Sequence, residues 1–186
     1  AAHLRARGCR VTPVGMEGEL DTATFSLAGK TKRDLRHYRN KAHKADLIVE
    51  ESADTAETRA ALLPVSHSWL PFKSWFASEL EFLARPFVPF PEPGVRIFAA
   101  RAGSKVVAFT VLDPMYDAGR VTGYTVSILR HLPEAPEGAC DFINLHVLDV
   151  LRGEGIPVLS LGVSPFCKID ELAQHFAEAH LALRLA

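Results

Sequence analysis

Two adjacent runs of β-forming residues constrain the fold of this chain more than any other feature. Val95 to Arg101 and Lys105 to Leu112 are rich in Val, Ile, Phe and Ala, and only Ala102-Gly103-Ser104 separates them. Two such runs joined by a short turn that contains glycine predict a β-hairpin. Val121 to Leu129 is a third run of this kind, after a predicted turn at Asp113 to Gly119. The centre of the chain therefore predicts an antiparallel meander of three strands.

Helices and further strands are predicted on both sides of this meander. A proline-rich loop from Pro86 to Gly94 precedes it, and Pro64 is expected to interrupt the helix predicted at Thr55 to Trp69. The order of elements predicts a mixed α/β fold, one domain over residues 1–186, with a central, largely antiparallel sheet flanked by helices. The other predicted segments are a strand at Cys9 to Val14, an acidic loop at Glu17 to Asp21, a basic helix at Lys30 to Lys44, a strand at Leu47 to Glu51, helices at Thr55 to Trp69 and Trp69 to Leu83, a helix at Cys140 to Arg152, a strand at Pro157 to Val163 and a helix at Ile169 to Leu183.

The segment from Lys30 to Lys44, KTKRDLRHYRNKAHK, concentrates the positive charge of the chain. Its net charge is +6, whereas the remaining residues sum to −7. The helical spacing of its apolar residues predicts an amphipathic helix with a cationic outer face, and Thr31 with Asp34 fits a capping box at its start. Such a face gains most from a polyanion, either RNA or an anionic lipid surface, and a solvated helix without a ligand is the alternative. The candidate phosphate-binding residues are Lys30, Lys32, Arg33, Arg36, Arg39, Asn40, Lys41 and Lys44.

Composition bounds the cellular setting and the cofactors. Cys9, Cys140 and Cys167 are isolated, which argues against a disulfide framework and a zinc site, and the scattered histidines predict no metal site. No apolar stretch approaches the roughly 18 to 20 residues that span a bilayer. We therefore expect a cytoplasmic location, with any membrane role at the cytoplasmic face of the inner membrane. The opening residues read like the end of a helix, so we expect a C-terminal fragment of a longer chain.

Two motifs each admit a catalytic and a structural interpretation. RGEGIP, residues 152–157, resembles the pyrophosphate-binding loop of acyl-CoA N-acyltransferases, but it follows a helix and precedes a strand, which favours a helix C-cap. Cys140, with His131 and His146 near it in sequence, fits a thiol nucleophile with a base, although a small buried cysteine is the favoured interpretation.

Two further side chains are candidate substrate contacts. Asp141 lies near a predicted helix N-terminus, where it is either an anchor for a substrate ammonium or a capping carboxylate. Ser164 follows a predicted strand, where it either bonds a substrate or forms a Ser-Pro turn. The sequence does not decide between these alternatives.

Taken together, these segments resemble the C-terminal domain of the bacterial phosphatidylglycerol lysyl/alanyltransferases, also called multiple peptide resistance factors. FSLAGKTKRDLRHYRNKAHKADLIVEE resembles that family's F-x-L-x-G-K-x-x-x-x-L-R-x-x-x-N-R-A block, with Lys41 in place of the arginine. The resemblance continues through Ser68-Trp69-Leu70, RIFAARAGSKVVAFTVL and YTVSILRHLPEAPEGACDFINLHVLDVLRGEGIPVLSLGVSP, and so covers most of the chain. It implies an enzyme of the acyl-CoA N-acetyltransferase (GNAT) fold that moves an amino acid from aminoacyl-tRNA to a lipid hydroxyl, with no bound cofactor.

The resemblance also implies roles for three residues. Asp141 matches the acid that opens the helix after the third strand and would orient the ammonium of the amino acid. Arg130 matches the arginine after that strand and would stabilise charge at the carbonyl or at the acceptor phosphate. Ser127 stands where the family tends to have Asp in Y-S-I-D-L-M-R, so lysine specificity and transfer itself are open at this position.

Three hypotheses follow for the function. The leading one is an aminoacyl-tRNA-dependent transferase that acts on a phosphatidylglycerol-like lipid or another hydroxyl or amine. The second keeps the fold and changes the donor to acyl-CoA or an acyl carrier protein, with the basic helix holding the phosphopantetheine of coenzyme A or the acidic carrier. The third is a non-catalytic module that docks a larger protein onto RNA or a membrane.

Overall fold

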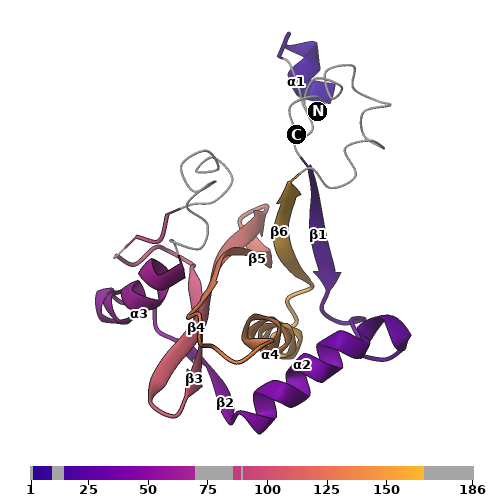
Figure 1. Ribbon diagram of the computed structural model, residues 1–186. Helices are drawn as coiled ribbons and strands as arrows, with labels where there is room; N and C mark the ends of the chain where they lie inside the picture. Colours follow the sequence, from indigo (N-terminus) through magenta and orange to yellow (C-terminus); the bar gives the residue numbers. More distant parts are fainter. Residues whose placement is uncertain (1, 10–14, 70–85, 89, 166–186) are drawn as a thin grey trace, which may run out of the picture. The chain divides into compact units, whose positions relative to one another are not determined.

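The computed structural model describes residues 2–9, 15–69, 86–88 and 90–165, and Figure 1 shows their secondary structure. The chain divides into two compact units, a larger one over residues 19–161 and a smaller one over residues 1–18 and 162–186. The smaller unit contains α1 (Ala2–Ala6). The predicted helices at Trp69 to Leu83 and Ile169 to Leu183, and most of the predicted strand at Cys9 to Val14, lie outside the described residues.

A six-stranded sheet in the order β1-β6-β5-β4-β3-β2 organises the described residues. The strands β2 to β5 are antiparallel neighbours, and β6 runs parallel to β5, with Gly123 opposite Val158. A parallel pair needs a crossover connection, which is supplied here by α4. The predicted class, a mixed α/β fold with a largely antiparallel sheet flanked by helices, is confirmed. The strands are β1 (Gly15–Asp21), β2 (Leu47–Ser52), β3 (Arg96–Ala102), β4 (Lys105–Asp117), β5 (Arg120–His131) and β6 (Val158–Pro165), and the helices are η1 (Lys30–Lys32), α2 (Arg33–Lys44), α3 (Ala56–Trp69) and α4 (Ala139–Gly153).

Helices cover both faces of the sheet in the larger unit (Figure 1). Phe109 of β4 contacts Phe87, which follows α3 in the chain, with ring centroids 5.1 Å apart. Phe98 of β3 contacts His146 of α4, at 6.1 Å. Because side chains alternate along a strand, these contacts define an α3 face and an α4 face, and α2 packs against α4 on the latter. The centre of β4 is buried on both faces, so the core spans the sheet.

The β-hairpins confirm the predicted meander but are longer than expected. The predicted turn at Asp113 to Gly119 is wrong, because β4 continues to Asp117 and only Ala118 and Gly119 form the turn. Both turn residues have positive φ, at 47° and 79°, which matches the twist of a tight two-residue hairpin.

Three other expectations also need correction. The acidic loop at Glu17 to Asp21 is part of β1, a sheet-edge strand whose mostly exposed side chains carry little strand signal. Pro64 does not interrupt α3. Proline has no N–H to donate to the Ala60 carbonyl, but Ala60 and Pro64 both lie on the solvent-exposed side of the helix, so no buried carbonyl loses its partner. The capping box is absent, since the 3-10 turn η1 delays the helix to Arg33 and no side chain caps it.

Two β-bulges on β5 are each closed by a hydroxyl group. Val111 opposes Ile128 while Leu112 opposes Val126, so Ser127 is an extra residue, and its Oγ donates to the Val111 carbonyl at 3.1 Å. Thr122 is the extra residue of the second bulge, and its Oγ1 donates to the Met115 carbonyl at 3.4 Å. The bulges change which β5 side chains reach each face.

Candidate functional site: the helix pair α2 and α4

Three of the predicted phosphate-binding cations on α2 and its entry turn have intramolecular partners. Lys41 forms an ion pair with Glu137. Arg36 donates from one nitrogen to the carbonyls of Leu27 and Gly29, at 2.5 and 2.7 Å, and so holds the segment that leads into the helix. Lys32 lies 5.0 Å from the centroid of the Phe25 ring. Because these intramolecular contacts already engage the three cationic groups, the groups are less available to bind a ligand.

The remaining cations of this segment are more available. Arg33 lies 3.8 Å from Asp34, and both side chains are at least 80% exposed, which makes a weak, water-screened pair. Within the described part of the chain, no acidic side chain forms an ion pair with Lys30, Arg39 or Lys44. The positive charge predicted for this helix therefore persists, but on a subset of its residues.

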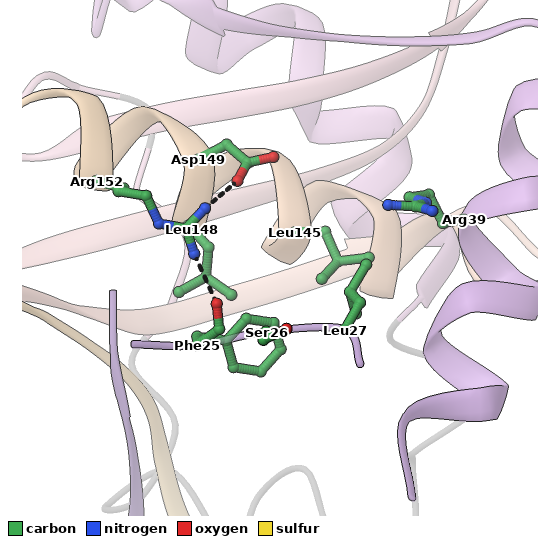
Figure 2. Close-up of a pocket in the computed structure, with 8 residues that line it drawn as sticks. All are labelled: Phe25, Ser26, Leu27, Arg39, Leu145, Leu148, Asp149 and Arg152. Atoms are coloured by element: carbon green, nitrogen blue, oxygen red, sulfur yellow. Dashed lines mark hydrogen bonds and ion pairs between the residues drawn. The ribbon is translucent and has the colours of Figure 1, made fainter. Parts of the chain in front are cut away.

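A groove runs between α2 and α4. One part is a cavity of about 340 Å³ lined by Arg39, Asn40 and His43 of α2 and by Phe142, Leu145, His146 and Asp149 of α4. An adjoining cavity of about 270 Å³ shares Arg39, Leu145 and Asp149 and adds Arg152 with the loop at Phe25, Ser26 and Leu27. Figure 2 shows Arg39 and Arg152 at opposite ends of this second cavity. We call the two cavities together the α2–α4 groove.

Arg152 fixes the loop that closes this groove. Its Nε donates to the Thr22 carbonyl at 2.7 Å. Figure 2 shows its other two bonds: one nitrogen donates to the Phe25 carbonyl at 2.9 Å, and another donates to Asp149 at 2.8 Å. Thr22 in turn donates to the Ile156 carbonyl at 2.6 Å. Asp149 is thereby neutralised, so the groove keeps a net positive charge.

A separate cavity of about 340 Å³ lies at the start of α4. Its polar lining comes from Tyr38 of α2, His131 of β5, and Glu137 and Asp141 at the helix N-terminus. Burial raises the pKa of the half-buried Asp141 above its ordinary 3.8. A carboxylate that has lost part of its hydration and lines a cavity is suited to accept a cation.

Cys140 lines the same cavity, but as a thiol. Burial, with the Asp141 charge as a smaller cause, raises its pKa to about 11. The thiolate needed for nucleophilic attack is therefore disfavoured at neutral pH. This favours the structural interpretation of Cys140 over the nucleophile.

Arg130 lies on the α3 face of the sheet. It is 8% exposed, opposes Phe109 in the strand register, and forms a hydrogen bond to Ser66 of α3. Burial lowers its pKa. Its neighbour His131 is the β5 residue that lines the Asp141 cavity, so the structure does not bring Arg130 and Asp141 together.

Of the two predicted serines, Ser127 is not among the residues that line this cavity. Ser127 occupies the bulge, where its hydroxyl bonds a backbone carbonyl. Ser164 is exposed within β6, which continues to Pro165, and it belongs to the smaller unit. Their predicted substrate contacts stay predictions.

The RGEGIP segment is a helix C-cap. The Gly155 N–H donates to the Arg152 carbonyl at 3.1 Å, and the Ile156 N–H donates to the Leu151 carbonyl at 2.9 Å. Gly155 has a φ of 72°, as expected after a helix end. Because these amides close the helix, they do not point at a pyrophosphate.

Sequence reasoning missed Asp149 as a groove residue and considered His146 only as a base. The available signal was spacing: Phe142, His146 and Asp149 recur at i, i+4 and i+7 on α4, which places them on one side of the helix. Arg39 and His43 recur at i and i+4 on α2. Nothing in the sequence indicates that these two rows face each other.

The family described as phosphatidylglycerol lysyltransferase, C-terminal, matches residues 1–186, and the chain belongs to this family. A phosphatidylglycerol lysyltransferase of Bacillus subtilis (strain 168) is 24% identical over 158 residues, which are 84% of this chain and 18% of that protein. One from Staphylococcus epidermidis (strain RP62A) is 25% identical over 176 residues, 92% of this chain and 20% of that protein. The chain therefore spans about a fifth of the length of these curated relatives.

Two solved structures share the fold. The L-PGS structure from Bacillus licheniformis has a TM-score of 0.63 and 22% identity, and the match covers 81% of this chain and 47% of that one. The C-terminal domain of a protein from Agrobacterium fabrum, named for lysylphosphatidylglycerol synthetase, has a TM-score of 0.65 and 22% identity over 88% of this chain and 51% of that one. Among the described residues of our chain, no helix combines the length and the apolar character needed to cross a bilayer.

Proposed function

We propose that this chain is the part of an aminoacyltransferase that moves an aminoacyl group from aminoacyl-tRNA to phosphatidylglycerol or a similar hydroxyl or amine acceptor. One observation carries the proposal: in a chain of this family, a half-buried carboxylate lines a cavity between the same two helices that form a cationic groove. The carboxylate suits the ammonium of an amino acid, and the groove suits phosphate. A donor that joins an amino acid to RNA carries both groups.

In the proposed mechanism, Asp141 binds and orients the aminoacyl ammonium. An incoming cation replaces the hydration that burial removes, so it favours the ionised carboxylate. The acceptor hydroxyl attacks the ester carbonyl, the bond to the tRNA oxygen breaks, and the acceptor's proton passes to that oxygen. Since the aminoacyl ester is already activated, positioning supplies much of the rate.

Arg130 takes no step at the Asp141 cavity in this mechanism. Its position on the α3 face means that its predicted role would require an acceptor phosphate or a carbonyl on that side of the sheet. A lipid acceptor and an RNA donor together place the reaction at the cytoplasmic face of a membrane.

The test uses the full-length protein with radiolabelled aminoacyl-tRNA and vesicles that contain phosphatidylglycerol. We expect label in the lipid extract, and we expect coenzyme A to cause no thermal shift. Absence of label from lipid and from small amines would overturn the proposal. Stabilisation by acyl-CoA and none by tRNA would instead favour the acyl-CoA-dependent transferase.

A further inference from the structure

We propose that Asn144 of α4 is a further substrate-binding residue, whose side-chain oxygen accepts a hydrogen bond from the aminoacyl ammonium that Asp141 holds. The inference rests on the proposed function, because it concerns the amino group of the same donor. It goes beyond that function by assigning a second acceptor to the ammonium and by predicting which donors the site rejects.

The Asn144 side chain occupies a helix position where an apolar residue is expected. It follows Cys140 by four positions and precedes Leu148 and Leu151 by four and seven, so these residues share one side of α4. Leu148 and Leu151 are at most 2% exposed and belong to the hydrophobic core. An asparagine in this row places a polar amide against apolar surface, which is unfavourable unless the amide finds partners.

The oxygen of this amide has no hydrogen-bond partner among the residues that the structure describes. Asn144 Oδ1 is buried, and no described donor lies within hydrogen-bond distance of it. A buried acceptor without a donor destabilises a fold, so such an atom in a native protein calls for a specific explanation. Since this oxygen lies close to a cavity, a ligand that enters the cavity can supply the missing donor.

Asn144 lies beside the Asp141 cavity. Cys140 and Asp141 both line that cavity, and they precede Asn144 by about one turn of α4. Side chains three positions apart on a helix have Cβ atoms about 5–6 Å apart. At ordinary hydrogen-bond lengths, two acceptors that share one tetrahedral ammonium lie about 5 Å apart. The spacing of Asp141 and Asn144 therefore suits a single ammonium between them.

The neighbouring groups also favour an ammonium as the ligand. Of the two carboxylates that line the cavity, Glu137 is already paired with Lys41, so Asp141 is the one that remains for a substrate. Asn144 adds an oxygen that accepts a second N–H without adding charge. A group with several N–H donors satisfies both residues, whereas an acyl group without an amine leaves the Asn144 oxygen buried and unpaired. Sites of this kind discriminate strongly against analogues that lack the donor.

The experiment compares donors that differ only in the α-amino group. The full-length protein is given tRNA esterified with radiolabelled alanine or lysine, or with the deaminated forms of these acids, propionate and ε-aminocaproate, and label in phosphatidylglycerol vesicles is measured. Asn144→Leu removes the acceptor at a similar side-chain volume. We expect about a 10- to 100-fold drop in kcat/KM for the aminoacyl esters and little change for the deaminated ones. Asn144→Asp keeps an acceptor oxygen in either protonation state, so it should keep most of the activity that Asn144→Leu loses.

Thermal melting separates a ligand contact from a structural role. Leucine replaces the unpaired oxygen with apolar surface, so the melting temperature of Asn144→Leu without substrate should stay level or rise by up to about 4 °C. An amide that bonds within the fold would lower it on removal. The control is Asn40→Leu, which removes the amide of an exposed asparagine on α2, and any effect on transfer should be the same for aminoacyl and deaminated esters.

Equal losses for the aminoacyl and deaminated esters in Asn144→Leu, or no loss for either, would overturn the inference. So would a melting temperature of this variant well below that of the wild type. Transfer by the wild type with an unaffected Asn144→Leu removes only this inference. If the wild type transfers no label, calorimetry with alanyl- and lysyl-adenosine in which an amide replaces the ester still tests it: tighter binding to the wild type than to Asn144→Leu removes only the proposed transfer, and equal binding removes the inference as well.

Discussion

Two charged regions of the larger unit use arginine in different ways. Within α3, Arg59 is fully buried, and its guanidinium bonds Asp54 at 2.5 and 2.9 Å, Glu92 at 3.1 Å and the Val88 carbonyl at 3.1 Å. In the α2–α4 groove, Arg39 is half-buried and no ion pair occupies it among the described residues. The first arginine is committed to the fold, because its partners tie the loop before β3 to α3. The second is available to a ligand. Arg59 therefore contributes to the stability of the fold, whereas Arg39 is suited to binding.

The largest expected effect is loss of stability on Arg59→Ala. The substitution removes the buried guanidinium that bonds Asp54 and Glu92, and breaking a buried ion pair typically costs about 3–5 kcal/mol of unfolding free energy. Urea denaturation measures it. Lys105→Ala is the matched control, because its pair with Glu134 is about 60% exposed on both sides and should be worth less than about 1 kcal/mol. Equal losses in both variants would erase the contrast between buried and exposed pairs.

Asp141→Asn should affect transfer more than folding. Removing the charge that binds an ammonium in a partly dehydrated cavity costs about 2–5 kcal/mol, so we expect about a 100-fold drop in kcat/KM. Lipid labelling measures the drop, and Asp117→Asn is the control, because Asp117 is an exposed carboxylate at the end of β4 that does not line this cavity. A variant as active as the wild type would exclude the proposed ammonium site.

The same substitution should change how stability depends on pH. Because burial raises the pKa of Asp141 above 3.8, the native state holds this proton more tightly than the unfolded state does. The contribution of this group is complete below its ordinary pKa and is lost as the pH rises through the folded pKa. Asp141→Asn should therefore gain stability relative to the wild type as the pH rises through that window, which denaturation at several pH values would show.

Gly138→Ala should loosen the helix pair. Gly138 has a φ of 83°, and a Cβ there would lie 2.8 Å from Tyr38 Cγ and closer still to Tyr38 Cβ. Strain and overpacking of this kind cost about 1–3 kcal/mol. Denaturation measures the cost, with Gly153→Ala as control, because a Cβ at Gly153 meets no atom within 4 Å. Equal stability of the two variants would show that the close approach of α2 to the start of α4 is not required.

Lys41→Gln should have the smallest effect. The ion pair with Glu137 is exposed on both sides, so its loss should cost less than about 1 kcal/mol. Denaturation of Lys41→Gln beside Glu137→Gln and the double variant gives the coupling energy of the pair. A coupling energy well above about 1 kcal/mol would mean that this pair stabilises the fold, as the Arg59 ion pairs do.

The meander and the basic helix were predictable because their signals are local. The hairpin depends on two β-rich runs and a short turn, and the apolar seam of α2 depends on helical spacing within one segment. The edge strand β1 was missed for the same reason, since its mostly exposed residues have little to distinguish them from a loop. Local signals identify elements whose own residues carry the pattern.

The site could be predicted only in part because it depends on contacts between distant segments. Whether Arg130 or His131 faces the Asp141 cavity is set by the β5 register, which the bulge at Ser127 shifts. Which cations stay available on α2 is set by groups elsewhere, such as Glu137, 96 positions from Lys41. The sequence shows which segment carries the positive charge, but the tertiary structure determines which of its cations remain available to a ligand.

Steady-state kinetics of Arg39→Gln and Lys41→Gln test most directly whether the cations that bind the donor differ from those that hold the fold. Both changes remove one positive charge from the same helix, and the assay is the steady-state transfer of label from aminoacyl-tRNA to phosphatidylglycerol. We expect Arg39→Gln to raise the KM for aminoacyl-tRNA with little change in kcat, and Lys41→Gln to match the wild type. Equal KM values for the two variants would contradict the assignment of the α2–α4 groove to the donor.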